Sequence, residues 1–132
     1  MKYLCIVYAG SGPNTLSATE QTAIKDGCIE QDHALFQAGK LVLASPLQGP
    51  EAAVSLHYRN GVASRTDGPY AETKEWIAGF MVIEAADIEE ALAIASEGPL
   101  EGLVDLEIRP LLDEQHSRTG MDRSIFFERG RK

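Results

Sequence analysis

The order of its apolar segments constrains the fold of this chain more than any other feature of the sequence. Short runs rich in β-branched and aromatic residues alternate with longer runs of helical periodicity. Glycine, proline and asparagine separate these runs, as is typical of turns. The predicted elements, in chain order, are strand 2–8, a helix from Ser17 or Thr19 to Ala38, strand 41–45, hairpin 53–66, strand 77–85, helix 87–96 and strand 103–111.

The hairpin has the clearest local signal. Asn60-Gly61 stands between two extended runs, and this pair favours a type I′ turn. With these residues as the loop, the register pairs Val54 with Asp67 and puts Arg65 on the same face as Asp67. This face is the more apolar of the two, so we expect it to point inward.

Removing the hairpin leaves the order βαββαβ, which predicts a ferredoxin-like α+β fold with one antiparallel sheet and two helices on one face. The other face of such a sheet needs cover. We therefore expect a homodimer in which two sheets pack face to face. Residues 1–112 form the predicted domain, and residues 113–132 form a C-terminal tail.

Composition and charge exclude several kinds of partner. Of the 132 residues, 44% are hydrophobic and 24% are charged, which is ordinary for one globular domain. Residues 1–112 carry 7 basic and 16 acidic side chains, and such a surface repels the phosphates of nucleic acids. No apolar run approaches the roughly 20 residues of a membrane-spanning helix. The apolar N-terminus is too short for a signal peptide, so a cytoplasmic location is expected.

The two cysteines do not indicate a disulfide framework or a metal site. Cys5 lies in a predicted strand and Cys28 in a predicted helix, with 22 residues between them. Free cysteines of this kind behave as small hydrophobic residues. A zinc site needs ligands at short spacing, and the sequence has none. We therefore predict neither a metal nor another cofactor.

The tail is polar except for Ile125-Phe126-Phe127. These three residues would anchor the tail on the body of the chain or on a partner subunit. A disordered tail is the alternative.

The most distinctive chemical feature is the run 67–75, which reads Asp-Gly-Pro-Tyr-Ala-Glu-Thr-Lys-Glu. Its first residues are typical of a turn, in which Asp67 bonds to backbone amides. A carboxylate at a partly covered position instead needs a partner or an elevated pKa, and either makes it a candidate for proton transfer or ligand binding. The candidate site residues in and beside the run are Asp67, Arg65, Tyr70, Glu72, Lys74 and Trp76.

The first predicted helix carries two further candidates. At about 100° per residue its apolar side chains form one arc, with Asp32 inside the arc and His33 just past its edge. A carboxylate among apolar neighbours is costly without a partner, so Asp32 is a candidate catalytic group. His33 is either a boundary histidine or a catalyst. The arc consists of Ile24, Cys28, Ile29, Leu35 and Phe36.

The run 67–75, followed by Gly79-Phe80, closely resembles the signature of the DGPF-type members of the YCII-related family. Residues 1–4 and 107–111 resemble the ends of that family, so the resemblance covers roughly residues 1–112. Tyr70 stands where the family usually has phenylalanine, and it adds a hydroxyl group.

This resemblance implies a ferredoxin-like α+β fold that forms a dimeric α+β barrel. For related YCII-type proteins it implies small-molecule chemistry by a His–Asp pair, and at least one acts as a dehydrochlorinating lyase on a hydroxyquinol. Similar domains also occur beside sigma factors, which implies a regulatory role. In this chain the hairpin register puts His57 on the face opposite Asp67, so these two do not form such a pair within one subunit.

Three hypotheses follow. In the first, the chain is a cofactor-independent small-molecule lyase or isomerase with Asp67 as its acid–base group. In the second, it is a non-catalytic module that binds a small molecule or a regulatory partner. In the third, Asp67 and Lys74 form an internal ion pair that shapes the turn. The supporting residues of the first hypothesis are Lys74 or Arg65 for tuning, Asp32 or His33 for assistance, and Tyr70 or Trp76 for lining the pocket.

Overall fold

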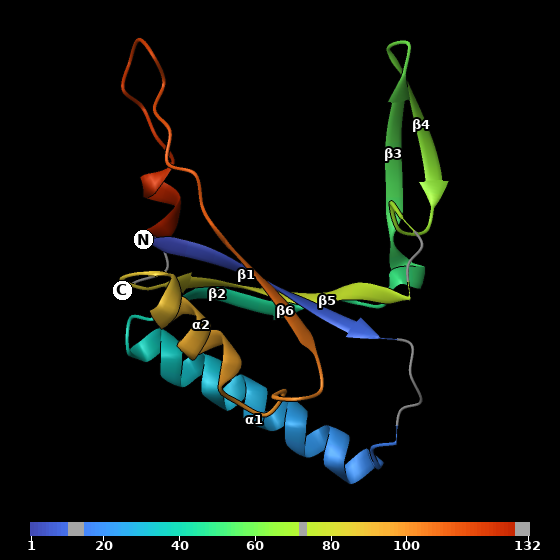
Figure 1. The fold of residues 1–132 in the computed structure, drawn as a ribbon. Helices are drawn as coiled ribbons and strands as arrows, with labels where there is room; N and C mark the ends of the chain where they lie inside the picture. The colour runs from blue at the N-terminus through green and yellow to red at the C-terminus, as the bar shows by residue number, and fades with distance from the viewer. Residues whose placement is uncertain (11–14, 72–73, 129–132) are drawn as a thin grey trace.

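The computed structural model describes residues 1–10, 15–71 and 74–128. Four antiparallel strands form one sheet in the order β2-β5-β1-β6, and β3 and β4 form a separate hairpin (Figure 1). Both α-helices cover the same face of the sheet (Figure 1). The element bounds are β1 Lys2–Gly10, α1 Ala18–Gln37, β2 Leu41–Pro46, η1 Pro50–Ala52, β3 Val54–Arg59, β4 Val62–Asp67, β5 Glu75–Glu84, α2 Ile88–Ser96, β6 Asp105–Pro110 and η2 Ser124–Phe127, where η marks a 3-10 helix.

This topology confirms the predicted fold class. Strand β1 pairs with β5 on one side and with β6 on the other, while β2 extends the sheet beyond β5. The chain is a ferredoxin-like α+β protein with a hairpin inserted between β2 and β5. Within the described residues, no helix is long and apolar enough to cross a membrane.

The inserted hairpin forms as its turn sequence predicts. Asn60 and Gly61 have φ angles of 51° and 77°, and positive φ at both central residues is the mark of a type I′ turn. The predicted register is confirmed, since Val54 pairs with Asp67. The hairpin stands away from the sheet on the side that the helices leave open (Figure 1).

The hairpin face that the sequence predicts to point inward is exposed. Val54, Leu56 and Tyr58 on this face are all exposed, whereas Ser55 on the other face is buried. The Ser55 hydroxyl donates a hydrogen bond of 2.8 Å to the carbonyl oxygen of Gly68. The prediction is wrong for the single chain, because the hairpin projects from the sheet (Figure 1) and, among the described residues, no core lies beneath its apolar face.

The core lies between the sheet and the helices. Side chains alternate between the two faces of a strand, so Tyr3 and Cys5 of β1 point to the helices and are buried. Helix α1 reaches this core near its C-terminus, through Leu35 and Phe36. The buried cluster comprises Tyr3, Cys5, Leu41, Ile83, Ala85, Ala91 and Ile94.

The opposite face of the sheet, which we call the open face, is apolar in its middle, along β1, β2 and β5, and charged along β6, where acidic and basic side chains stand opposite those of β1. Leu4 and Ile6 of β1 pair with Val82 and Phe80 of β5 on this face. Leu43 of β2 is exposed beside them. The hairpin and the C-terminal segment rise from opposite ends of the sheet on this side and leave the face open between them (Figure 1).

The long helix α1 is docked without burying any of its 20 residues. Ser17 caps its first turn and takes part in the predicted capping box. Gly27 allows a close approach to the loop after α2, since an added Cβ would lie 2.9 Å from Cγ of Pro99. The Gln31 side chain donates a 2.9 Å hydrogen bond to the carbonyl oxygen of Glu97. These contacts hold the middle of the helix and leave space beneath it.

Candidate functional site

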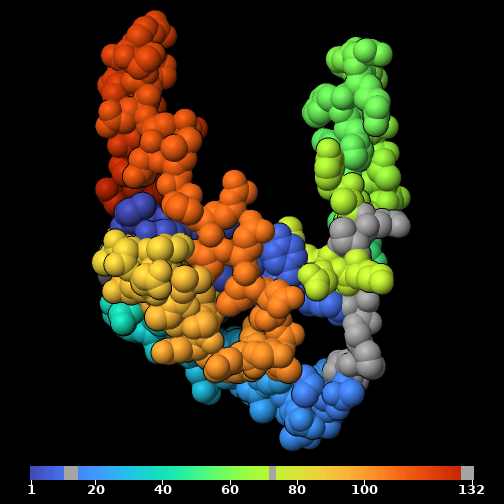
Figure 2. Space-filling view, viewed as in Figure 1, coloured from blue at the N-terminus to red at the C-terminus, as the bar shows by residue number. Residues whose placement is uncertain are grey.

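A cavity lies between α1 and the sheet, beside the core. Its volume is about 810 Å³. It is bounded by α1, by β1, β2 and β5, and by the segment from α2 to β6. Figure 2 shows a gap in the surface on this side, between the orange residues that precede β6 and the blue residues of the N-terminal half of the chain. A volume of this size falls within the range of roughly 300–1,000 Å³ that is usual for small-molecule sites.

Small side chains on the sheet create this space. Ala9, Ala44 and Ala78 line the cavity from three different strands. Gly79 also lines it, and the neighbouring strand leaves no room for a side chain there, because an added Cβ would lie 3.0 Å from the carbonyl oxygen of Ser45. Since these positions carry at most a methyl group, the helix above them does not fill the gap.

Asp32 supplies the half-buried carboxylate of the cavity. It lines the cavity from the apolar face of α1, as the helical arc predicts. Burial raises its pKa, and the charge of the neighbouring His33 opposes this shift. In the described part of the chain, no hydrogen bond or ion pair holds this carboxylate. Asp32 is therefore a carboxylate among apolar neighbours, and no described residue pairs with it.

Other charged residues of the cavity wall are exposed to solvent. Lys25 belongs to α1, Glu97 and Glu101 to the loop after α2, and Asp105 to β6. Because exposed charges keep their hydration, they impose little on a bound molecule. Among the charged residues of the described wall, Asp32 is the half-buried one.

Cys28 lies one helical turn before Asp32 and lines the same cavity. Its pKa is raised, first by burial and second by the negative charge of Asp32. A thiol with a raised pKa stays protonated near neutral pH, so Cys28 has the properties of an apolar wall residue rather than of a nucleophile. Cys5 is fully buried in the core, where burial raises its pKa to about 11.

His33 is exposed on α1 and does not line the cavity. This outcome matches the interpretation of a boundary histidine. It leaves Asp32 without a histidine partner inside the cavity.

Asp67 ends β4 at the base of the projecting hairpin. Its side chain is 88% exposed, and its Oδ1 lies 3.7 Å from Nε of Arg65. The predicted sharing of one face by Arg65 and Asp67 is therefore confirmed, but the predicted cover over Asp67 is absent in the single chain. Among the described residues its ion-pair partner is Arg65 rather than Lys74, which is exposed before β5.

The turn after Asp67 folds back on the hairpin. The Gly68 amide donates a 2.8 Å hydrogen bond to the carbonyl oxygen of Ala53, and Gly68 has a φ of 112°. The Tyr70 ring stacks on the His57 ring, with centroids 5.1 Å apart and an angle of 19° between the planes. His57 lies on the face opposite Asp67, as the register predicts. No local sequence pattern predicts this stack, because it depends on the path of the chain after the turn.

The candidate residues fall into two groups on opposite sides of the sheet (Figure 1). Asp32 and His33 belong to α1, whereas Asp67 belongs to the hairpin on the open side. The hypothesis that Asp32 or His33 assists Asp67 is therefore wrong within one chain. Trp76 is half-buried at the start of β5. Glu72 lies outside the described residues.

Metal ligands do not gather in the described part of the molecule. Among residues 1–10, 15–71 and 74–128, no cluster of three or more His, Cys, Asp or Glu side chains is placed to hold a metal ion. The cavity thus combines apolar walls with a carboxylate and a thiol.

The fold and the cavity together define a ferredoxin-like α+β protein with a small-molecule-sized site between its first helix and its sheet. Residues 1–113 match the family model of the YCII-related domain. The chain belongs to the YCII-related family, which confirms the resemblance stated above for the run 67–75.

This chain is similar to one protein in sequence and to another in structure. The chain is 39% identical over 79 residues to the uncharacterized protein R00369 of Rhizobium meliloti (strain 1021), in a match that covers 57% of this chain and 62% of that protein. The chain therefore spans less than two thirds of the length of this relative. A solved structure with 16% identity and a TM-score of 0.44 is that of 5-chloro-2-hydroxyhydroquinone dehydrochlorinase (TftG) from Burkholderia phenoliruptrix AC1100, in complex with 2,5-dihydroxybenzoquinone. That match covers 86% of this chain and 96% of the solved one, and at this level of similarity it says nothing of a substrate for this chain.

Proposed function

We propose that this chain binds a small, uncharged and largely apolar molecule in the cavity between α1 and the sheet and catalyses a proton transfer on it. The reaction class is that of a lyase or isomerase that uses no resident cofactor. The observation that carries the proposal is the half-buried, unpartnered carboxylate of Asp32 in a cavity of about 810 Å³.

The cavity favours an uncharged ligand for two reasons. Its walls are mainly alkyl groups, and residues 1–112 carry an excess of acidic side chains that repels anions. Asp32 offers a hydrogen-bonding group to a hydroxyl or carbonyl of such a ligand. An apolar cavity with few polar groups is the usual form of a small-molecule site.

Asp32 suits acid–base chemistry because burial raises its pKa towards the working pH. As a base, its carboxylate takes a proton from a C–H bond next to a carbonyl group, and the electron pair of that bond forms a double bond. In a lyase a leaving group departs from the adjacent carbon with its bonding pair. In an isomerase the same carboxyl group returns the proton to another carbon. Neither route needs an oxidant or a reductant.

Asp67 remains a second candidate for the acid–base group, in an assembled dimer. The apolar middle of the open face, which includes Leu4, Ile6 and Leu43, supports the expected homodimer of face-to-face sheets. In such a dimer the hairpin would extend beside the second copy and bring Asp67 with Arg65 under cover.

The experiment begins with the full chain and a panel of uncharged phenols, cyclic enones and lactones. Binding is measured by the rise in melting temperature, and proton transfer by deuterium uptake into the bound compound in D₂O, followed by NMR. Cys28→Phe should fill the cavity and remove binding. Ala34→Phe, on the exposed side of the same helix, is the matched control and should bind normally.

The outcomes separate the two classes of function. Binding with deuterium uptake supports the enzyme. Binding by the wild type without deuterium uptake or product supports the non-catalytic binding module instead. A folded Cys28→Phe variant that binds as well as Ala34→Phe excludes the cavity as the site.

A further inference from the structure

The segment 97–104, which we call the entrance loop, joins α2 to β6. Pro99, Leu100 and Val104 of this loop line the cavity, which α1 bounds on another side. In Figure 2 the orange residues that precede β6 border the gap in the surface. The entrance loop is therefore an edge of the way into the cavity.

Gln31 of α1 holds the start of the entrance loop. Its Nε2 donates a 2.9 Å hydrogen bond to the carbonyl oxygen of Glu97. Its side-chain amide also occupies the space that a side chain at Gly98 would need. Gln31 lines the cavity and directly precedes Asp32 in the helix, so this contact lies beside the half-buried carboxylate.

Gly27 of α1 allows the next residue of the loop to approach the helix. An added Cβ at this position would lie 2.9 Å from Cγ of Pro99, so alanine does not fit there without displacing the loop. Glycine in the interior of a helix lowers its stability relative to alanine, and Gly27 lies in the middle of α1. The contact with Pro99 offsets this loss, which gives the glycine a role in holding the loop.

Beyond these two contacts, the entrance loop has the properties of a segment that moves. None of the described residues 97–104 is buried, and Leu103 is 50% exposed. Gly98 and Gly102 have φ angles of 129° and 80°, and glycines at such positions accommodate large changes in backbone dihedral angles. Between them, the Glu101 amide donates a 3.1 Å hydrogen bond to the carbonyl oxygen of Gly98. This turn keeps its own shape when the loop moves.

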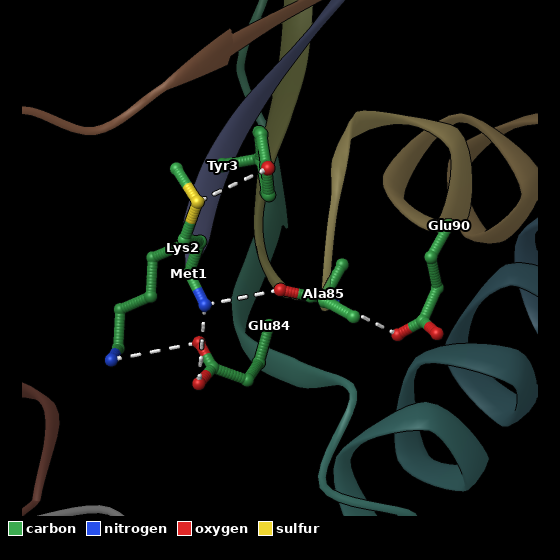
Figure 3. Close-up of polar contacts among 7 residues, drawn as sticks. Met1, Lys2, Tyr3, Glu84, Ala85 and Glu90 are labelled. Carbon is green, nitrogen blue, oxygen red and sulfur yellow. Dashed lines mark hydrogen bonds and ion pairs between the residues drawn. The ribbon is translucent and has the colours of Figure 1, made fainter.

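Helix α2, which leads into the entrance loop, is fixed at its other end. The Ala85 amide donates a 3.0 Å hydrogen bond to the carbonyl oxygen of Met1, and Oε1 of Glu90 accepts one of 3.3 Å from the Ala86 amide. Figure 3 shows Ala85 beside Met1, with Glu90 reaching back from the helix. Ala91 of α2 is fully buried in the core. Movement is therefore confined to the segment after α2.

We propose that the entrance loop is a gate of the cavity, which opens by releasing Glu97 and Pro99 from α1 and closes by regaining both contacts. This inference rests on the cavity given under Proposed function as the binding site, and it deepens that proposal because it says how a molecule reaches the site. One hydrogen bond between uncharged groups and one contact of a half-exposed proline hold the gate shut, so local opening is far easier than unfolding.

Cys28 reports the opening without any ligand, since its thiol lies in the cavity wall. The test measures how fast the full chain reacts with 4,4′-dithiodipyridine, an uncharged disulfide that exchanges with a thiol and releases the absorbing 4-thiopyridone. When opening is fast relative to this exchange, the rate is proportional to the open fraction. Cys5 is fully buried in the core and reacts only when the chain unfolds, and the variant Cys28→Ser measures its rate alone.

Three variants probe the two contacts. Gln31→Ala removes the hydrogen bond to Glu97 and should raise the Cys28 rate by about two- to tenfold, the factor that one such hydrogen bond is worth. The matched control, Gln37→Ala, makes the same change at an exposed glutamine of α1 outside the cavity wall and should leave the rate unchanged. Gly27→Ala displaces Pro99 and should raise the Cys28 rate by at least about threefold, although alanine favours the helix.

A faster reaction of Cys28 in Gln31→Ala, with the rate of Cys5 unchanged, supports the gate. A Gln31→Ala chain whose Cys28 reacts at the wild-type rate overturns it, and so does a Cys28 that reacts only as fast as Cys5 in every variant. An equal rise in both rates means that the chain unfolds as a whole, which also overturns the gate. Gly27→Ala at the wild-type rate excludes Pro99 from the gate.

The thiol assay uses no compound of the ligand panel, so its result is independent of the proposed function. If Gln31→Ala leaves the Cys28 rate unchanged while a panel compound still binds the wild type, the gate is wrong and the binding site stands. If no panel compound binds but Gln31→Ala accelerates the reaction of Cys28, the gate stands and the proposed ligand class is wrong.

Discussion

The two sides of the sheet carry two carboxylates with opposite surroundings. Asp32 lies half-buried in the cavity under α1, unpartnered within the described residues, and burial raises its pKa. Asp67 lies on the projecting hairpin, where it is 88% exposed and pairs with Arg65. A charge-rich run is therefore not by itself evidence of a covered site, since water screens its charges. Asp67 stands at the start of the charge-rich run 67–75, whereas Asp32 is the carboxylate that lies half-buried in a cavity.

The contrast follows from what each region packs against. Helix α1 has the sheet of its own chain beneath it, and small side chains such as Ala44 and Ala78 leave a cavity there. Among the described residues nothing covers the hairpin face that holds Val54 and Leu56, and both side chains are exposed. The cavity is thus formed within one chain, whereas the apolar face of the hairpin is exposed in the single chain.

The largest effect is expected from exchanging each carboxylate for an amide. Asp32→Asn should lower the rate of proton transfer by about 10²–10⁴-fold, because the amide cannot take up the proton. Asp67→Asn should leave the rate nearly unchanged in the same assay. The measurement is deuterium uptake into the compound that the cavity binds. The reverse pattern, with Asp67→Asn inactive and Asp32→Asn active, would assign the chemistry to the hairpin.

Substitutions at two glycines test whether the hairpin and the sheet unfold independently of each other. In Gly79→Ala the new Cβ would lie 3.0 Å from the carbonyl oxygen of Ser45 and 3.2 Å from Cα of Pro46. This overpacking should lower the free energy of unfolding of the whole sheet by about 1–3 kcal/mol. In Gly68→Ala nothing lies within 4 Å of the new Cβ, but the φ of 112° is strained for alanine.

The strain at Gly68 should stay local to the hairpin, because the hairpin has few contacts with the sheet. Hydrogen exchange should therefore show loss of protection in β3 and β4 for Gly68→Ala, with β1 and β5 unchanged. For Gly79→Ala the protection of β1, β2 and β5 should fall together. Equal losses across the molecule in both variants would show that hairpin and sheet unfold as one unit.

The sequence predicts the fold well because the signals of the fold are local. Asn60-Gly61 determines the hairpin register within a few residues, and Ser17 caps the helix by a contact to its own first turn. Alternation along the strands identifies the buried residues once the strand order is known. In the same way, the periodicity of one helix places Asp32 among its apolar side chains.

Local sequence patterns predict neither the cavity nor the direction in which the hairpin points. The cavity forms because alanines from three strands and Gly79 lie together under one helix. No local sequence pattern predicts that these residues are neighbours. The sequence predicts that the hairpin face with Val54 and Leu56 points inward, because its residues are apolar. Apolar residues alone do not indicate whether the same chain or another one covers them. The stack of Tyr70 on His57 depends on how the chain turns after Gly68.

The pH dependence of stability should separate the two carboxylates further. Burial raises the pKa of Asp32 above its usual value of 3.8, so the folded chain holds this proton more tightly than the unfolded chain does. The stability from the neutral form is fully present below pH 3.8 and is lost as the pH rises through the folded pKa. An asparagine at this position does not ionise, so its contribution to stability does not fall as the pH rises.

Asp32→Asn should therefore melt at a higher temperature than the wild type at pH 7, and this difference should shrink towards pH 3.8 and below. Asp67→Asn, at the exposed carboxylate of the hairpin, is the matched control. Differential scanning calorimetry from pH 3 to pH 8 provides the measurement. A difference between Asp32→Asn and wild type that is constant over this range would mean that ionisation of Asp32 does not contribute to it.

The smallest effect is expected from the ion pair on the hairpin, and it tests whether the hairpin is covered. Arg65→Ala should change the free energy of unfolding by less than about 0.5 kcal/mol in the single chain, because exposed ion pairs contribute little. Urea denaturation at protein concentrations below and above the dimer Kd makes the comparison. If a second copy covers the hairpin, the loss should grow with concentration and resist added salt, since covered charges are screened less than exposed ones. A loss that stays small at every concentration would leave Asp67 in water in the dimer too, and so remove it as a candidate catalytic group.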